Sequence, residues 1–123
     1  DGRQLARREA QLVAAAAVEL RAVGVDRGFY APVPEADLQR YAASVPDDFR
    51  FLLKAHAALT TVPGGTPPAF LAGVPPAFLD VEHARRAVIE PAMRALGPKL
   101  GVVLFQFSPL GPRVLRHRER LLY

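Results

Sequence analysis

The chain has 123 residues, which is enough for one domain, and half of them are hydrophobic, which excludes a disordered polypeptide. It contains no cysteine, and this excludes disulfides, a thiolate nucleophile and cysteine-based zinc sites. The formal net charge of +4 permits binding of phosphate or nucleic acid, but it also fits an ordinary arginine-rich surface.

The first predicted element is an alanine-rich helix over residues 3–18, with arginines on its polar side. Its most apolar part, Leu12–Val18, follows charged residues as in a signal peptide, but Glu9 and Gln11 interrupt that pattern. No apolar run approaches the roughly 18–20 residues that a membrane helix needs. We therefore expect a bacterial, cytoplasmic protein with no membrane partner, and Asp1 at the start suggests that the chain was cut from a longer one.

A first strand is predicted over Leu20–Val25, and it runs directly into the polar pair formed by Asp26 and Arg27. Alternation places Gly24 and Asp26 on one face of the strand and Val25 on the other. A glycine and two aromatic residues, ending at Tyr30, follow the polar pair.

A second helix is predicted over Glu35–Ala43, because two acidic residues in its first turn complement the helix dipole. A second strand follows over Phe49–Lys54 and leads to His56. Alternation places Phe51 and Leu53 on one face of this strand, together with its first residue, and Lys54 on the other face.

Residues 57–80 are rich in proline and glycine, and a loop of this length is typically functional or mobile. Within it, Pro67–Leu71 and Pro75–Leu79 have the same sequence, which is too short a duplication for a repeat architecture. We expect the aromatic residues Phe70 and Phe78 to pack within the loop rather than to form a lid.

A third helix is predicted over Val81–Leu96, capped by Asp80 and kinked or split at Pro91. On this helix His83 is expected to be exposed, and the same expectation holds for His117 further along the chain. Four residues form an approximate apolar stripe along the helix: Ala84, Val88, Met93 and Leu96.

The third strand is predicted over Gly101–Phe107, and a last helix over Arg113–Tyr123. Strands that start about 30 and 50 residues apart need crossover connections, and these make the sheet parallel. Three such strands are too few for a free-standing domain. Residues 1–123 are therefore interpreted as one partial α/β domain, whose two strand edges lead to self-association when it is expressed alone.

Several stretches resemble the domain of unknown function 72 family in order and spacing, from about residue 20 to about residue 110. They are Val23–Pro32, Val45–Phe51 with Lys54–His56 and Leu59–Thr60, and Phe78–Asp80 with Leu96–Gly97 and Leu104–Phe107. The resemblance implies a parallel-stranded TIM-like (β/α) barrel about twice as long as this chain. The chain would then hold a partial barrel of about three strands with flanking helices, without the first strand and the later ones. The resemblance implies no reaction, because the family's activity is not established.

The stretch Val23–Pro32, which resembles the second strand of the family's barrel, departs from the family pattern in three places. Many members carry a glutamate where Gly24 stands, an asparagine where Asp26 stands, and a hydroxyl residue where Gly28 stands. If the glutamate is chemically required, either Asp26 takes over the acidic role in this chain or the chemistry is different.

In a parallel barrel the carboxyl ends of the strands converge, so the polar residues that follow the three strands are expected to lie together. We predict catalytic roles for Asp26, Lys54 and His56. Asp26 would act as a base or orienting partner, Lys54 would stabilise negative charge, and His56 would transfer protons near neutral pH. The alternative that Asp26 and Lys54 pair only as structure stays open, as does a backbone-capping role for His56.

Three further residues are predicted to contact the substrate. Tyr30 would close the rim of the pocket, Gln106 would donate or accept hydrogen bonds, and Arg27 would lie beside Asp26. Gln106 shares its strand face with Asp26 and Lys54 by alternation. The expected ligand is therefore a small polar or anionic molecule.

We predict no metal, because the histidines are scattered, and no cofactor, because no glycine-rich phosphate loop opens a helix. The leading function is an acid–base enzyme, hydrolase-like or isomerase-like. The alternatives are a non-catalytic phosphate- or nucleic-acid-binding module, which would use Lys54 and the C-terminal arginines, or a truncated chain without activity. Those arginines are Arg113, Arg116, Arg118 and Arg120.

Overall fold

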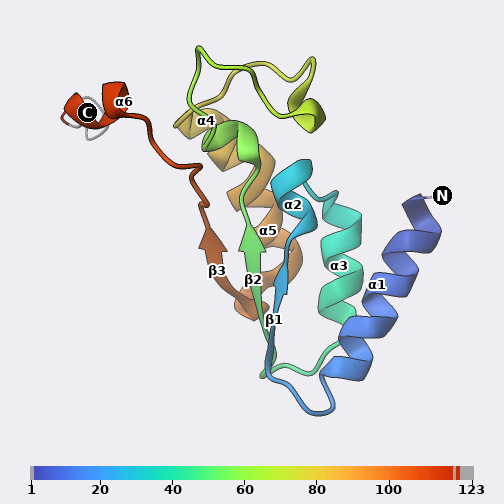
Figure 1. Cartoon of the computed structure of the whole chain (residues 1–123). Coiled ribbons are helices and arrows are strands. Elements are labelled where there is room, and N and C mark those ends of the chain that lie inside the picture. The colour runs from blue at the N-terminus through green and yellow to red at the C-terminus, as the bar shows by residue number, and fades with distance from the viewer. Residues whose placement is uncertain (1, 118, 120–123) are drawn as a thin grey trace.

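The structure, a computed structural model, describes residues 2–117 and 119. Its centre is a three-stranded parallel sheet in the order β1-β2-β3, formed by Ala22–Val25, Arg50–Lys54 and Leu100–Leu104. In Figure 1 the three arrowheads point to the same end of the molecule, where the loop of residues 57–80 and α6 lie. The predicted α/β class and the parallel sheet are confirmed.

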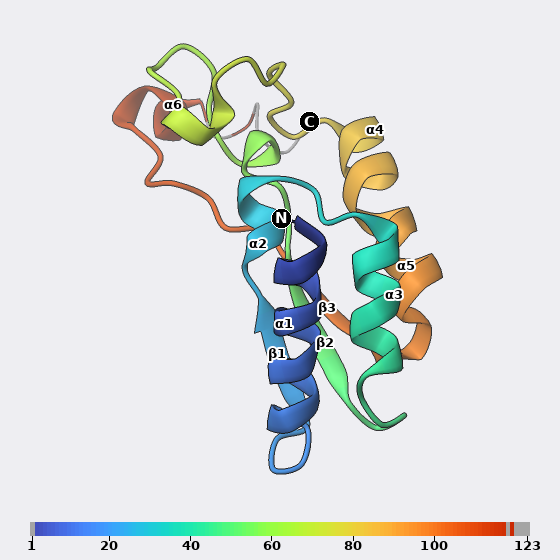
Figure 2. The ribbon, with the colours of Figure 1, turned by 90° about the vertical axis from the view of Figure 1, so that its right-hand side faces the viewer.

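The helices gather on one face of the sheet, as the two perpendicular views show (Figures 1 and 2). The principal ones are α1 (Gly2–Ala16), α3 (Glu35–Ala43) and α5 (Glu90–Leu96). Short helical segments occupy the connections: α2 (Arg27–Tyr30), η1 (Ala57–Leu59), η2 (Ala69–Leu71), α4 (Val81–His83), η3 (Ala84–Ile89), η4 (Gly97–Lys99) and α6 (Pro112–Arg116). None of the described helices is long and apolar enough to cross a membrane.

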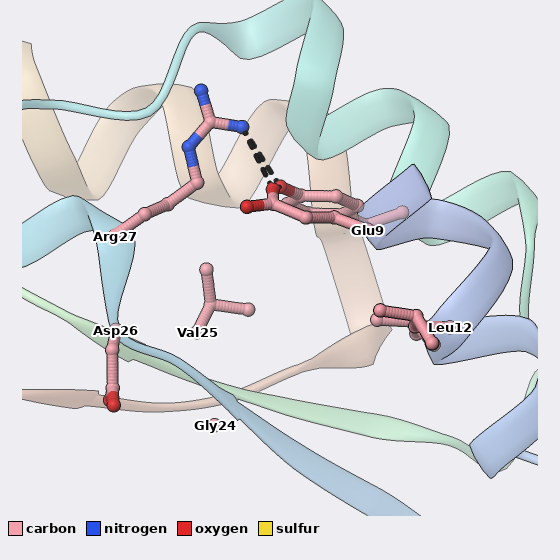
Figure 3. Close-up of a pocket in the computed structure, with 8 residues that line it drawn as sticks. Glu9, Leu12, Gly24, Val25, Asp26 and Arg27 are labelled. Atoms are coloured by element: carbon pink, nitrogen blue, oxygen red, sulfur yellow. Dashed lines mark hydrogen bonds and ion pairs between the residues drawn. The ribbon is translucent and has the colours of Figure 1, made fainter. Parts of the chain in front are cut away.

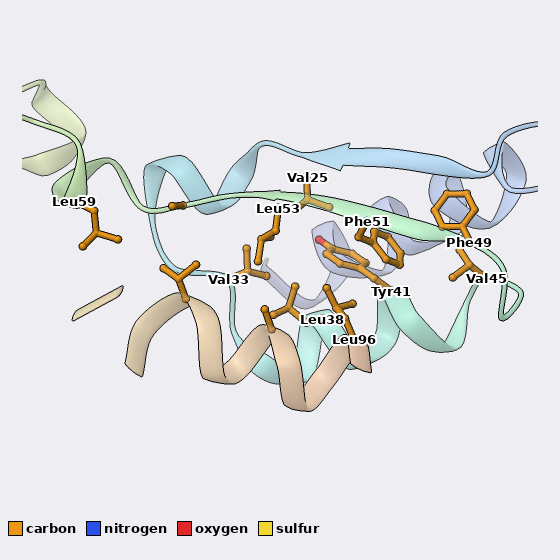
Figure 4. Packing of buried hydrophobic residues seen from close by; sticks show 13 residues of the cluster. Val25, Val33, Leu38, Tyr41, Val45, Phe49, Phe51, Leu53, Leu59 and Leu96 are labelled. Carbon is orange, nitrogen blue, oxygen red and sulfur yellow. The ribbon is translucent and has the colours of Figure 1, made fainter. Parts of the chain in front are cut away.

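The hydrophobic core lies between the sheet and the helices, as Figure 4 shows. Phe51 and Leu53 point from β2 toward α3 and α5, as the alternation of β2 predicts, and both are buried. The Phe51 ring stacks on Tyr41 of α3 with ring centroids 6.3 Å apart and meets Phe49 edge-on at 5.3 Å. Burying large aromatic rings supplies much of the stabilisation of so small a core.

The helix predicted over Val81–Leu96 is interrupted before Pro91, as expected, but by a π-helical segment rather than by a break. Proline lacks an N–H and its ring clashes with the carbonyl group four residues earlier. The π segment η3 avoids that clash by widening the turn, so that the N–H of Glu90 donates to the carbonyl oxygen of Arg85. Val88 and Leu96 then face the core, but Met93 is exposed, which corrects the predicted stripe.

The face of the sheet that points away from the helices is open. Val102 is 54% exposed and Leu104 is 39% exposed. Strand β3 ends at Leu104, earlier than predicted, because β2 pairs with it only as far as Lys54 and the N–H of Ala55. Strands β1 and β3 therefore form the two edges of this sheet, with an apolar surface between them.

Lys99 holds the opposite, amino-terminal end of the sheet against α3. Its Nζ donates to the carbonyl oxygens of Ala42 and Val45, at 2.7 and 2.9 Å, just where α3 ends. Carbonyl groups at a helix C-terminus lack intrahelical partners, so the ammonium group satisfies them directly. The turn into β2 is thereby fixed at its start.

The last predicted helix is described only in part. Helix α6 spans Pro112–Arg116, so it begins one residue earlier than predicted, and His117 after it is in a turn. Arg113 and Arg116 are exposed. Arg118 and Arg120 lie outside the described residues, so the structure does not test the basic surface predicted for this end.

Candidate functional site at the carboxyl edge of the sheet

Asp26 and Lys54 meet at the carboxyl edge of the sheet, as predicted. The register of β1 and β2 pairs Gly24 with Leu52, so the residues two positions further on lie side by side. Oδ1 of Asp26 is 3.3 Å from Nζ of Lys54. The Asp26 side chain is 71% exposed and the Lys54 side chain only 23%. The pair thus presents a carboxylate to solvent with an ammonium group below it.

Gly28 sets the close approach of α2 to the end of β2. A Cβ at this position would lie 2.6 Å from the carbonyl oxygen of Lys54, which is closer than any real contact. Only glycine lets the backbone of α2 lie directly on that carbonyl group. The approach also brings Phe29 near Lys54, whose Nζ lies 6.0 Å from the centroid of the ring.

Three aromatic rings form one side of this edge. Tyr30 contacts Phe29 and Phe70 edge-on, with ring centroids 5.4 and 5.0 Å apart. Tyr30 is 56% exposed, which fits the rim position expected for it. Phe70 packs against α2, and Phe78 packs against Phe107 at 6.3 Å, so the loop of residues 57–80 is attached to the rest of the chain by both aromatic residues.

Arg27 does not join Asp26 and Lys54, which corrects the expectation that all three lie together. Its guanidinium group points to the helix side of the sheet, where it pairs with Glu9 and Asp37 at 3.2 and 3.0 Å. It also donates to the hydroxyl oxygen of Tyr41 at 2.9 Å. The two neighbouring residues point to opposite sides of the sheet, and Arg27 lies on the same side as Val25, two residues before it.

The Arg27 network lines a cavity of about 290 Å³ between α1 and β1 (Figure 3). Tyr41 donates a short hydrogen bond to Glu9 inside it. Burial, and then this bond to Glu9, raise the pKa of Tyr41 to about 12. Leu12 and Gly24 line the cavity's apolar part. The residues are mutually satisfied, so the network holds α1 and α3 on the sheet.

His56 lies at the start of η1, two residues beyond Lys54, and is buried with 3% of its surface exposed. Its Nδ1 lies 3.1 Å from Nε2 of His83. Burial, and then the charge on His83, lower the pKa of His56 below its ordinary value of 6.5. His83 is half-buried rather than exposed, which corrects the prediction from the helical pattern.

Gln106 and the two histidines lie apart from the Asp26–Lys54 pair. Gln106 is exposed beyond the end of β3, and among the described residues no hydrogen bond joins it to Asp26 or Lys54. The described residues likewise include no hydrogen bond or ion pair between His56 and that pair. In the described part of the chain no three histidine or acidic side chains come together as a metal site would require.

A parallel sheet with its helices on one face and charged groups on its carboxyl edge defines the class of this protein, a partial TIM-like α/β barrel. Residues 2–122 match the family described as "Protein of unknown function DUF72". The chain belongs to this family, and the resemblance seen in the sequence is confirmed.

Two crystal structures of a DUF72 family protein from Enterococcus faecalis V583, at 2.52 and 3.10 Å resolution, are similar to this chain. The first is 18% identical with a TM-score of 0.55, over 91% of this chain and 43% of that one. The second is 17% identical with a TM-score of 0.51, over 89% of this chain and 38% of that one. The chain therefore spans less than half the length of this relative, and the likeness concerns the fold alone. No curated protein matches the chain.

Proposed function

We propose that the carboxyl edge of the sheet binds a small polar or anionic molecule and acts on it by acid–base chemistry. The observation that carries the proposal is the ion pair between Lys54 and a largely exposed Asp26. A pair this exposed contributes little to stability, typically about 0–1 kcal/mol, so stability alone explains it poorly. It stands at the edge where barrels of this class hold their active sites.

The charges suit a ligand that carries a negative group. The ammonium group of Lys54 stabilises negative charge that develops on the ligand, and Asp26 accepts a proton from it. Tyr30 bounds the ligand on the aromatic side, and Gln106, exposed beyond the end of β3, offers a hydrogen bond to the part of a ligand that extends past the ion pair. Arg27 contributes by fixing the start of α2 from the other side of the sheet.

Inorganic phosphate is a suitable first probe, with binding followed by the backbone amide signals in a ¹H–¹⁵N NMR titration. In the wild type, phosphate should shift the signals of residues 26–30 and 54–56. Lys54→Met should abolish these shifts. Asp26→Asn should strengthen binding about fivefold, because it removes a negative charge worth about 1 kcal/mol at this distance in water.

The matched control is Asp48→Asn, which removes another exposed aspartate paired with a basic side chain, Arg21, at 2.6 Å on the amino-terminal edge. This variant should bind phosphate as the wild type does. Phosphate shifts that persist in Lys54→Met, or that are absent from the carboxyl edge of the wild type, would show that the ion pair is structural.

A further inference from the structure

The contact between His56 and His83 has the geometry of one straight hydrogen bond. The facing nitrogens are 3.1 Å apart and the ring centroids 5.4 Å apart, a difference of about 2.3 Å that equals two imidazole ring radii. The nitrogens therefore lie on the line between the rings. If the two nitrogens bound one metal ion, both would point at the metal instead of at each other. The ring centroids would then lie closer together for the same distance between the nitrogens. The geometry is that of one N–H···N hydrogen bond, and the tautomers of the two rings decide which nitrogen donates.

The second nitrogen of His56 remains available. Among the described residues Nε2 of His56 has no hydrogen-bond partner, and none of the fully buried side-chain nitrogens and oxygens there lacks one. Nε2 therefore keeps a contact with solvent although the residue is almost entirely buried. One nitrogen held by a partner and the other open is the arrangement of histidines that transfer protons.

We propose that His83 and His56 form a two-way proton relay, in which His83 sets the protonation state of the open Nε2 of His56. This inference goes beyond the function proposed above, because the two rings lie apart from the Asp26–Lys54 pair, and it assigns His83 as a positioning residue. The proton between the rings can sit on Nδ1 of His56 or on Nε2 of His83. In the first case Nε2 of His56 is unprotonated, and in the second case it carries a proton.

In the first form, Nδ1–H of His56 donates to Nε2 of His83, and Nε2 of His56 is free to accept a proton. When Nε2 takes a proton, the Nδ1 proton passes to His83, and His83 releases its own Nδ1 proton to water. His56 is then left with a proton on Nε2 and accepts a hydrogen bond at Nδ1. Donation from Nε2 and uptake of a proton by His83 reverse each step, so a cycle neither gains nor loses protons.

The other charged groups near the pair are engaged elsewhere. Oδ1 of Asp80 accepts the backbone N–H of His83 at 3.0 Å, as the cap of α4. Glu82 pairs with Arg85 and Arg86 on the exposed side of the helix. The lowered pKa of His56 supports the relay, because His56 is then neutral and able to accept a proton near neutral pH.

Side-chain ¹⁵N NMR of the intact protein tests the relay without any ligand. In the wild type we expect a coupling between the two nitrogens through the hydrogen bond. We also expect both neutral rings to carry their proton on the same kind of nitrogen, both on Nδ1 or both on Nε2. The two rings should change tautomer together, because the proton between them links the two changes. Opposite tautomers in the two rings, or no coupling, would overturn the proposal.

Two variants separate positioning from simple packing. His83→Gln keeps a group that can hydrogen-bond to Nδ1 but cannot pass a proton, so exchange between the two His56 tautomers through this contact should stop. His83→Phe keeps the volume and should leave Nδ1 without a partner. If the two His56 tautomers exchange in His83→Gln as they do in the wild type, the relay is wrong. The phosphate titration at Lys54 does not involve these rings, so failure of the relay and failure of the proposed site give different results.

Discussion

Replacing Gly28 with alanine tests whether the contact between α2 and the end of β2 positions the candidate site. The added Cβ would lie 2.6 Å from the carbonyl oxygen of Lys54 and 3.4 Å from Cγ2 of Val33. Strand β2 is the central strand and is paired on both sides, so its backbone has no room to move. The variant must therefore push α2 off the sheet and carry Asp26 away from Lys54.

Forcing an extra carbon into a well-packed contact costs typically about 1–3 kcal/mol. With a urea m value of about 2 kcal/mol/M, a loss of about 2 kcal/mol lowers the unfolding midpoint by about 1 M. Gly24 provides the matched control, because a Cβ there meets nothing within 4 Å. Gly24→Ala should be stabilised by about 0.5–1 kcal/mol, since glycine is the less favourable residue in a strand.

Urea unfolding followed by circular dichroism compares the two variants with the wild type. The expected order of midpoints is Gly24→Ala, then wild type, then Gly28→Ala. A midpoint for Gly28→Ala that equals or exceeds the wild-type midpoint would refute the reasoning, because it would mean that α2 does not rest on the carbonyl group of Lys54.

Three further predictions concern other parts of the chain. Tyr41 keeps its proton to about pH 12 when folded, against 10 when unfolded, so it contributes stability below pH 10 that is lost as the pH rises toward 12. Tyr41→Phe should remove that part of the alkaline loss, measured as unfolding free energy against pH. The pKa of His56 is lower in the folded chain than in the unfolded one, so the unfolded chain binds a proton more readily as the pH falls. The free energy of unfolding should therefore be highest above pH 6.5 and decrease below it. His56→Asn should reduce this decrease. Val102→Lys should shift the chain toward monomer in size-exclusion chromatography, whereas Leu5→Lys, at a similarly exposed position on α1, should not.

The sheet could be predicted from sequence because its signals are local. Phe51 and Leu53 lie on one face of β2 and the charged Arg50 and Lys54 on the other, and the face of Phe51 and Leu53 is the buried one. The end of β3 could not be predicted in this way. Phe105 and Phe107 continue the apolar pattern, but a strand ends where its partner ends, and β2 leads into η1 after Lys54.

The site was predictable in part, for a related reason. Asp26 and Lys54 end neighbouring parallel strands, so topology alone brings them together. Arg27 follows Asp26 directly, and alternation alone would have placed it on the opposite face, with the buried Val25. Its partners Glu9 and Tyr41 come from other helices, and no spacing in the sequence relates them.

His83 was missed because the prediction assumed a regular α-helix. At 3.6 residues per turn, His83 and Val88 differ in direction by about 140°, which places the histidine outside when the valine is inside. The π segment takes up about one extra residue, and the difference falls to about 40°. Pro91 just beyond the segment is the one local signal that could have indicated the change.

The contacts of Lys99 bear on how this chain can change over evolutionary time. They are made to carbonyl oxygens of the main chain, so they do not depend on which side chains stand at positions 42 and 45. Substitutions can accumulate in that turn while a single lysine keeps its shape. The opposite edge of the sheet depends on particular side chains for its ion pair and its aromatic rim, so drift at one end need not alter the chemistry at the other.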